Sequence, residues 1–323
     1  MTEPADVAVG QLVRHRTESA WGLGKVVHVT HDQVFVYFKD ITGTPKEAVK
    51  GFSRRMQVLS LAEVQRDVVL DHLPPMVQNG ALKIPTARRT TAQQAINAFI
   101  QRYRHFEDPE YLKQERNYKW DAHVLCCERL LSPEGRQLLT DGDGEAASAT
   151  LRKIVHATNL LATSEIISVT DGLKNPEAAL QTARRVVDFV DRDGAPAFAA
   201  LIDAIEDLPM PPEGKRILTW PVATIFAFLA KPDVHMFLKP MQTRKTADAF
   251  MFDLLYTPRP NWGTYERLRE LSRVILESIR PLGARDMIDV QSFMWVVNGA
   301  PYMQPPKRPA KSRPAGPDDG ELV

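Results

Sequence analysis

The sequence has few features of a secreted or membrane protein. It contains only two cysteines among its 323 residues, and they are adjacent, Cys126 and Cys127. Adjacent cysteines rarely bridge to each other, so a reducing compartment is expected. The longest apolar run, near 222–230, is far shorter than the ~20 residues of a membrane helix. Because the first residues have neither a basic start nor an apolar stretch, they are unlike a signal peptide. We therefore expect a cytoplasmic protein.

The sequence also lacks an excess of charge and the familiar catalytic motifs. Its 41 Lys and Arg against 40 Asp and Glu give a net charge of +1, which provides no overall attraction to nucleic acid or membranes. There is no Walker A motif, dinucleotide fingerprint, HExxH or GxSxG. His123 could share a helical face with the two cysteines, but no second cluster is present to complete a zinc site. The sequence therefore predicts neither a cofactor nor a metal.

What is present begins with a β-rich segment of about sixty residues. Two runs rich in β-branched and aromatic residues, Lys25–Thr30 and Gln33–Lys39, flank a short polar turn and indicate a hairpin. A strand at Gln11–His15 and closing strands at Lys46–Val49 and Met56–Ser60 complete a set of five. Short strands at this spacing predict a small SH3-like or Tudor-like barrel.

Three stretches of this segment follow a recognisable pattern: Val13-Arg14-His15, then Trp21-Gly22-Leu23-Gly24-Lys25-Val26-Val27, then Val34-Phe35-Val36-Tyr37-Phe38. Residues 9–60 thereby resemble the Tudor-like module at the C-terminus of UvrD/PcrA-type helicases and the RNA-polymerase-interacting module of CarD-type regulators. Trp21 stands where that pattern more usually has Phe or Pro. The resemblance implies an adaptor that binds protein or nucleic acid and performs no chemistry itself.

Strand alternation predicts which side chains of this module face outward. Val34, Val36 and Phe38 should point into the core, and the residues between them should point away from it. The predicted binding surface of the barrel comprises Arg14, Trp21, Lys25, Phe35 and Tyr37.

The chain divides into four parts by composition and periodicity. The barrel covers residues 1–60, and a linker follows over 61–89, with a short helix ended by Leu73-Pro74-Pro75. Apolar residues at helical spacing then predict an all-α domain over 90–298. The tail, 299–323, is rich in Pro, Lys and Arg and is predicted to be disordered. The fold class is thus mostly α with a small β domain.

Within the helical domain we expect a buried helix at 219–230, an extended stretch at 235–240, a helix capped by Thr264 and a last helix near 285–297. Glu115 and Lys119 are four residues apart on the predicted helix 111–131, the spacing of an ordinary i,i+4 helix pair. A nuclease interpretation of these two residues lacks the strand hairpin that it requires.

Charged residues gather in the last third of the domain. Lys239, Arg244, Lys245 and Arg259, with Trp262 beside them, could bind an anion or a nucleic-acid backbone. Asp286 and Asp289 are three residues apart and should face the same side of a helix. They could complete that pocket, but pairing with Arg285 and the helix dipole is the favoured interpretation.

The leading hypothesis is a non-enzymatic adaptor in transcription or DNA metabolism. Its barrel would bind a protein partner, RNA polymerase or a repair factor, or nucleic acid, and no membrane. One alternative is an enzyme acting on nucleic acid with its site in 235–291, and another is a self-assembling structural or defence-system component. An enzyme should bring Lys239, Arg259, Asp286 and Asp289 together in one pocket, whereas in an adaptor they should be paired off.

Overall fold

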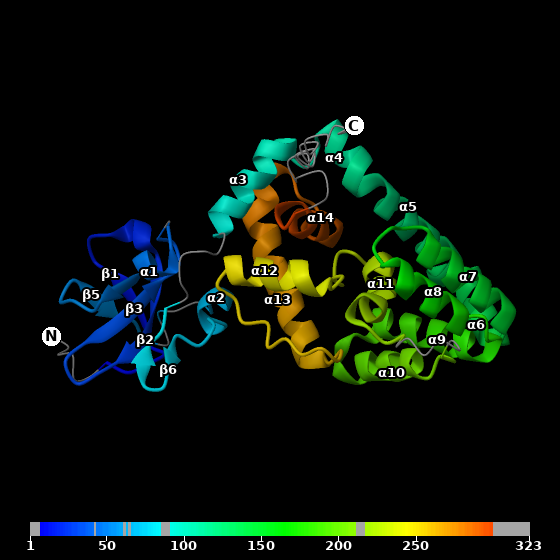
Figure 1. Ribbon diagram of the computed structural model, residues 1–323, viewed down its shortest axis with the longest axis horizontal. Helices are drawn as coiled ribbons and strands as arrows, with labels where there is room; N and C mark the ends of the chain where they lie inside the picture. The colour runs from blue at the N-terminus through cyan, green and yellow to red at the C-terminus, as the bar shows by residue number, and fades with distance from the viewer. Residues whose placement is uncertain are drawn as a thin grey trace, which may run out of the picture.

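The computed structural model describes residues 7–41, 43–60, 63, 66–84, 91–210 and 217–299. A small sheet module lies at one end of the molecule, and the remainder is helical (Figure 1). The predicted fold class, mostly α with a small N-terminal β part, is confirmed. Apart from Gly299, the predicted disordered tail lies outside the described residues.

The N-terminal module is an antiparallel sheet of five strands in the order β4-β3-β2-β1-β5. Its strands are β1 (Leu12–His15), β2 (Leu23–Val29), β3 (Val34–Phe38), β4 (Val49–Gly51) and β5 (Met56–Val58). The hairpin between β2 and β3 forms as predicted, with a register shift between Val26 and His28. Among the described residues, β4 and β5 do not pair with each other, so the sheet is open rather than a closed barrel.

One face of this sheet carries the core that the alternation predicts. Val13, Val26, Val36 and Phe38 are buried together, and Trp21 packs at their margin. Gly24 has a steric reason to be glycine, because a Cβ atom there would lie 2.7 Å from the ring of Phe38. Gly24 thus allows β2 to cross closely over the core, and Gly22, at a φ of +65°, forms the turn before it.

The other face of the sheet is covered by the segment that follows it. This segment contains α2 (Val68–Asp71) and a two-stranded hairpin of β6 (Val77–Gln78) and β7 (Ala81–Leu82). Tyr37 is buried there with Leu70, Met76 and Met251. The prediction that Tyr37 belongs to an exposed surface is wrong: it points away from the barrel core, but a second core covers it. Residues 66–84, predicted as part of a linker, therefore pack as a layer on the sheet.

The first part of the helical region is α3 (Ala92–Tyr103) followed by a long helix from Pro109 to Leu131. Thr91 caps α3 through a capping box with Gln94. The long helix consists of α4 (Pro109–Tyr111), a π-helical turn η3 (Leu112–Arg116), α5 (Asn117–Cys126) and a second π-helical stretch η4 (Cys127–Leu131). A π-turn rotates the side chains that follow it relative to a regular helix, and such turns are frequent at functional sites.

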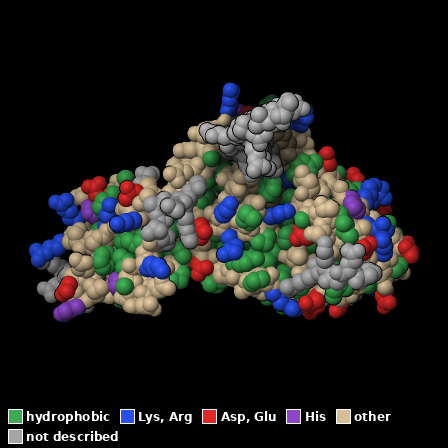
Figure 2. All heavy atoms as spheres, viewed as in Figure 1, with side chains coloured by type: hydrophobic (Ala, Val, Ile, Leu, Met, Phe, Trp, Pro, Cys, Tyr) green, Lys and Arg blue, Asp and Glu red, His purple; other side chains and the backbone are tan. Residues whose placement is uncertain are grey.

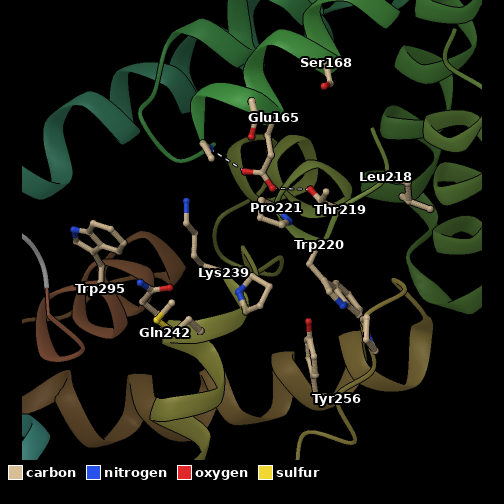
Figure 3. Close-up of a pocket in the computed structure, with 15 residues that line it drawn as sticks. Glu165, Ser168, Leu218, Thr219, Trp220, Pro221, Lys239, Gln242, Tyr256 and Trp295 are labelled. Carbon is tan, nitrogen blue, oxygen red and sulfur yellow. Dashed lines mark hydrogen bonds between the residues drawn. The ribbon is translucent and has the colours of Figure 1, made fainter. Parts of the chain in front are cut away.

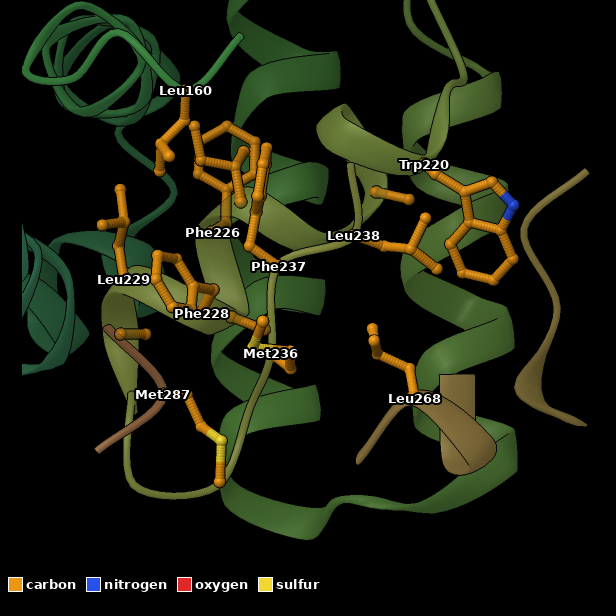
Figure 4. Packing of buried hydrophobic residues seen from close by; sticks show 14 of the residues in the cluster. Leu160, Trp220, Phe226, Phe228, Leu229, Met236, Phe237, Leu238, Leu268 and Met287 are labelled. Atoms are coloured by element: carbon orange, nitrogen blue, oxygen red, sulfur yellow. The ribbon is translucent and has the colours of Figure 1, made fainter. Parts of the chain in front are cut away.

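Among the remaining helices, α11 (Trp220–Ala230) has all of its residues buried (Figure 4). This helix confirms the buried segment predicted near 219–230, with Thr219 as its N-cap. The others are α6 (Pro133–Asp141), α7 (Gly144–His156), α8 (Thr163–Gly172), α9 (Pro176–Arg192), α10 (Gly194–Glu206), α12 (Pro240–Ala249), α13 (Trp262–Ile279) and α14 (Met287–Val297). The predicted N-cap of α13 is wrong by three residues, because the side chain of Asn261 accepts the capping hydrogen bond and the backbone N–H of Thr264 donates it.

Candidate functional site

A buried ionic network joins the long helix to α14. The guanidinium of Arg116 donates to both carboxylate oxygens of Asp286, at 2.9 and 2.7 Å, and to Oδ1 of Asp289 at 2.8 Å. Tyr111 donates its hydroxyl to Asp289 at 2.5 Å, and Arg285 donates its backbone N–H and Nε to the other oxygen. Burial lowers the pKa of Arg116, but the two carboxylates outweigh burial and raise it.

The favoured interpretation of the two aspartates holds in this network. Asp289 pairs with Arg285, and Asp286 caps α14 by accepting from the backbone N–H groups of Ile288 and Asp289. The additional partner, Arg116, lies 170 residues before Asp286 and was not predicted. The aspartates are therefore neutralised within the protein.

A second buried pair follows one turn along the long helix. Lys119 is fully buried and Glu115 is 3% exposed. The Lys119 ammonium donates to Glu115 at 3.0 Å and to the hydroxyl of Ser292 on α14 at 2.7 Å. Burial lowers the pKa of Lys119, and the nearby Glu115 opposes that shift. The i,i+4 pair that the spacing predicts is therefore present, and it is buried between the long helix and α14.

A cleft opens beside this pair. Its inner chamber has a volume of about 210 Å³ and is lined by Gln114, Glu115, Tyr118, Lys119, Asn159, Leu160, Phe237, Lys239, Gln291 and Trp295. An outer chamber of about 630 Å³ shares Lys239 and Trp295 with it. The outer chamber is further lined from α8, α11 and α12 and by Tyr256 and Pro258 (Figure 3). The outer chamber has a volume typical of small-molecule sites, and the inner chamber is smaller.

Lys239 stands at the junction of the two chambers. In Figure 3 it extends between Trp295 and Glu165. Its ammonium donates to the backbone oxygen of Leu160 at 2.7 Å. Glu165 is held on the opposite side by Thr219, whose hydroxyl donates to it at 2.8 Å. Burial lowers the pKa of Lys239, and Glu165 opposes that effect.

The other cations of the predicted anion pocket do not line this cleft. Arg259 pairs with Glu206 at 2.6 Å, and Arg244 lies over the ring of Tyr256 at 5.0 Å. Lys245 is exposed on α12, and Trp262 packs against Phe198. The structure thus brings Lys239 to the cleft but does not gather Lys239, Arg244, Lys245, Arg259 and Trp262 into one pocket, and that grouping is corrected.

The predicted surface of the sheet module is divided between its two faces. Lys25 donates to the backbone oxygen of Leu70 at 2.7 Å and so joins Tyr37 in the covered face. Trp21 lies against His15 and Phe38 and beneath the ammonium of Lys50. Phe35 is half-buried and stacks on His28, and Arg14 is exposed.

Three further findings concern metal ligands, thiols and membrane helices among the described residues. No group of three or more His, Cys, Asp and Glu side chains within them could hold a metal ion. Cys126 and Cys127 are free thiols, and His123 contacts the backbone oxygen of Leu229 at 2.6 Å. In the same ranges, no helix combines the length and the apolar character needed to cross a membrane.

Gln291 and Trp295 are among the residues of the inner chamber that the predicted anion pocket did not include. Both lie in the apolar segment of α14, where the sequence displays no motif. Comparison with known proteins adds no guide to them: no family model, curated protein or solved structure matches the chain.

Proposed function

We propose that the protein is a non-enzymatic, cytoplasmic adaptor in DNA or RNA metabolism whose N-terminal module binds a nucleic-acid backbone. The Tudor-like barrel resemblance of residues 9–60 suggests a binding role. The charge of the segment favours nucleic acid as the partner, because residues 7–60 contain eight Lys and Arg against four Asp and Glu. RNA polymerase or another protein is the alternative partner.

The surface that supports this proposal surrounds Trp21. Its ring lies 4.6 Å from that of His15, and the ammonium of Lys50 lies 5.6 Å above it. Next to His15, the backbone N–H of Arg16 donates to the oxygen of Arg55 at 2.8 Å, which brings two exposed arginines together. Figure 2 shows Lys and Arg side chains over this end of the molecule. Cations beside an aromatic ring are the combination that single-stranded nucleic acids bind.

The face available to a protein partner is less suited to docking. Tyr37, the largest of the predicted aromatic contacts apart from Trp21, is 5% exposed and packed inside the molecule. Protein interfaces usually depend on a few large aromatic or arginine anchors that enter a pocket of the partner. The loss of Tyr37 from the surface weakens the protein-docking alternative and leaves the basic residues as the main feature.

The test is fluorescence anisotropy with labelled single-stranded DNA, duplex DNA and RNA. We expect binding that weakens with salt, and Arg16→Gln with Arg55→Gln should reduce the slope of log K against log salt by about 2. The control pair, Arg129→Gln with Lys153→Gln, removes two exposed cations from the helical part and should leave the slope unchanged.

Two results would reject the proposal. One is the absence of binding to any of the three nucleic acids at low salt. The other is an equal loss of affinity in the control pair, which would indicate diffuse attraction by the whole protein. Nuclease-resistant capture of RNA polymerase, abolished by the Arg16/Arg55 pair, would instead favour the protein-binding alternative.

A further inference from the structure

The inner chamber contains a polar atom that the protein itself leaves unsatisfied. The side chain of Gln291 is 6% exposed, and among the described residues its Oε1 has no hydrogen-bond partner. Burying an acceptor without a donor is costly, so such atoms are rare and call for an explanation. Gln291 is one of the residues that line the chamber, so a rotation of its amide would bring this buried oxygen to a ligand that donates an N–H or O–H.

The remaining lining indicates what kind of donor fits. Three aromatic side chains, Tyr118, Phe237 and Trp295, line the same chamber. Gln291 and Trp295 are one turn apart on α14, so the amide and the indole lie on the same side of that helix. A flat ring can stack on an aromatic side chain while its edge donates to the amide oxygen.

The charges of the chamber argue against an ammonium group as the donor. Glu115 is the carboxylate of the lining, and Lys119 already neutralises it at 3.0 Å. An amine entering the chamber would therefore meet no free negative charge, and it would lie close to the ammonium of Lys119. A neutral heterocycle avoids that repulsion.

Lys239 supplies the complementary feature at the mouth of the chamber. Its ammonium has three N–H groups, and the described residues accept a hydrogen bond from it at the backbone oxygen of Leu160. Lys239 lines both chambers, so it lies beside any part of a ligand that extends from the inner chamber into the outer one. An ammonium at this position can bind a phosphate.

We propose that the cleft binds a nucleotide, with the base in the inner chamber donating to Gln291 and the phosphate beside Lys239. The outer chamber, with Tyr256 and the exposed Met241 in its lining, has room for the rest of a mononucleotide or for a neighbouring nucleotide of a single strand. The site does not depend on the basic surface around Trp21, so its failure and that of the proposed adaptor function are distinguishable.

The experiment is isothermal titration calorimetry of the full chain with AMP, GMP, CMP and UMP, their nucleosides, and ribose 5-phosphate. We expect at least one nucleotide to bind, and ribose 5-phosphate to bind at least about tenfold more weakly because it lacks the base. Gln291→Leu should weaken that nucleotide about tenfold, the effect of losing one hydrogen bond to a buried acceptor. Gln181→Leu, at an exposed glutamine on α9, is the matched control and should change nothing.

Lys239→Met tests the phosphate separately. It should abolish the preference for nucleotide over nucleoside and leave the nucleoside affinity within about twofold, because the lost contact is to the phosphate alone. Thermal melting checks that each variant is folded. Trp295→Leu, at a half-buried position, provides a second variant that should also weaken binding of the base about tenfold.

A short single-stranded oligonucleotide distinguishes the two sources of the same chemistry. If it binds more tightly than the mononucleotide and is sensitive to Gln291→Leu, the site takes an unpaired base of nucleic acid; if the mononucleotide binds more tightly, the site takes a free nucleotide. The proposal is overturned if no nucleotide binds, if ribose 5-phosphate binds equally well, or if the folded Gln291 and Trp295 variants bind like the unaltered protein.

Discussion

Replacing Arg116 by Met should destabilise the protein strongly. The side chain of Arg116 is 7% exposed, and its guanidinium makes hydrogen bonds to Asp286 and Asp289. Methionine has a similar length but leaves two buried carboxylates without this partner. Removing one member of a buried ion pair typically costs about 3–5 kcal/mol, because the remaining charge is uncompensated. We expect a loss of that size in the free energy of unfolding, measured by urea denaturation followed by circular dichroism.

A second variant separates uncompensated charge from lost packing. Asp286→Asn and Asp289→Asn added to Arg116→Met remove the charges, and asparagine can still cap α14 at position 286. This triple variant should recover about half of the loss or more, because no buried charge remains unpaired. The reasoning would be refuted if Arg116→Met lay within about 1 kcal/mol of the unaltered protein, or if the triple variant were less stable than Arg116→Met.

The remaining predictions concern three other positions. Burial lowers the pKa of His235 to about 4 in the folded protein, so the unfolded chain binds a proton at a higher pH than the folded protein does. About 3 kcal/mol of stability should therefore be lost as pH falls from about 6.5 to 4. His235→Phe, compared over the same pH range by urea denaturation, should lack that loss. Tyr37→Ala should cost about 3 kcal/mol by opening the core between the sheet and residues 66–84, and the half-buried Phe35→Ala should cost less; equal losses in equilibrium unfolding would contradict the assigned layer. Thr219→Ala should cost about 1 kcal/mol through the N-cap of α11, and Thr219→Ser, which keeps the capping oxygen, should restore stability in thermal melts.

The sequence predicts elements better than it predicts what covers them. The apolar run that becomes α11 and the alternation of β3 are local patterns, and both were identified correctly. The burial of Tyr37 depends on Leu70, Met76 and Met251, which are 33 or more residues away along the chain. Alternation places a side chain on a face of a sheet but carries no information about a second layer packed on that face.

The same limitation applies to the cleft. Glu115 and Lys119 have the spacing of a helical ion pair, which says nothing of its burial, and the π-turn beside them has no sequence signature that distinguishes it from a regular helix. Gln291 lies within an apolar stretch, and nothing in its spacing indicates that it lines a cavity. The charge of Lys239 indicates an anion site, but the residues grouped with it lie elsewhere: Arg259 pairs with Glu206, and Arg244 lies over the ring of Tyr256. Sites built from several helices cannot be assembled from the spacing within any one of them.

The network around Arg116 also constrains the order in which parts of the protein can fold during synthesis. Arg116 leaves the ribosome 170 residues before Asp286, its partner. At ordinary rates of synthesis, on the order of ten seconds or more separate the two. The backbone bond from Phe106 to Leu282 spans a similar interval. The helices in between can pack on one another first, but the wall of the cleft formed by α14 arrives last. Until it does, an arginine and a lysine that end in the interior must remain hydrated, so completion of the cleft belongs to the final step of folding.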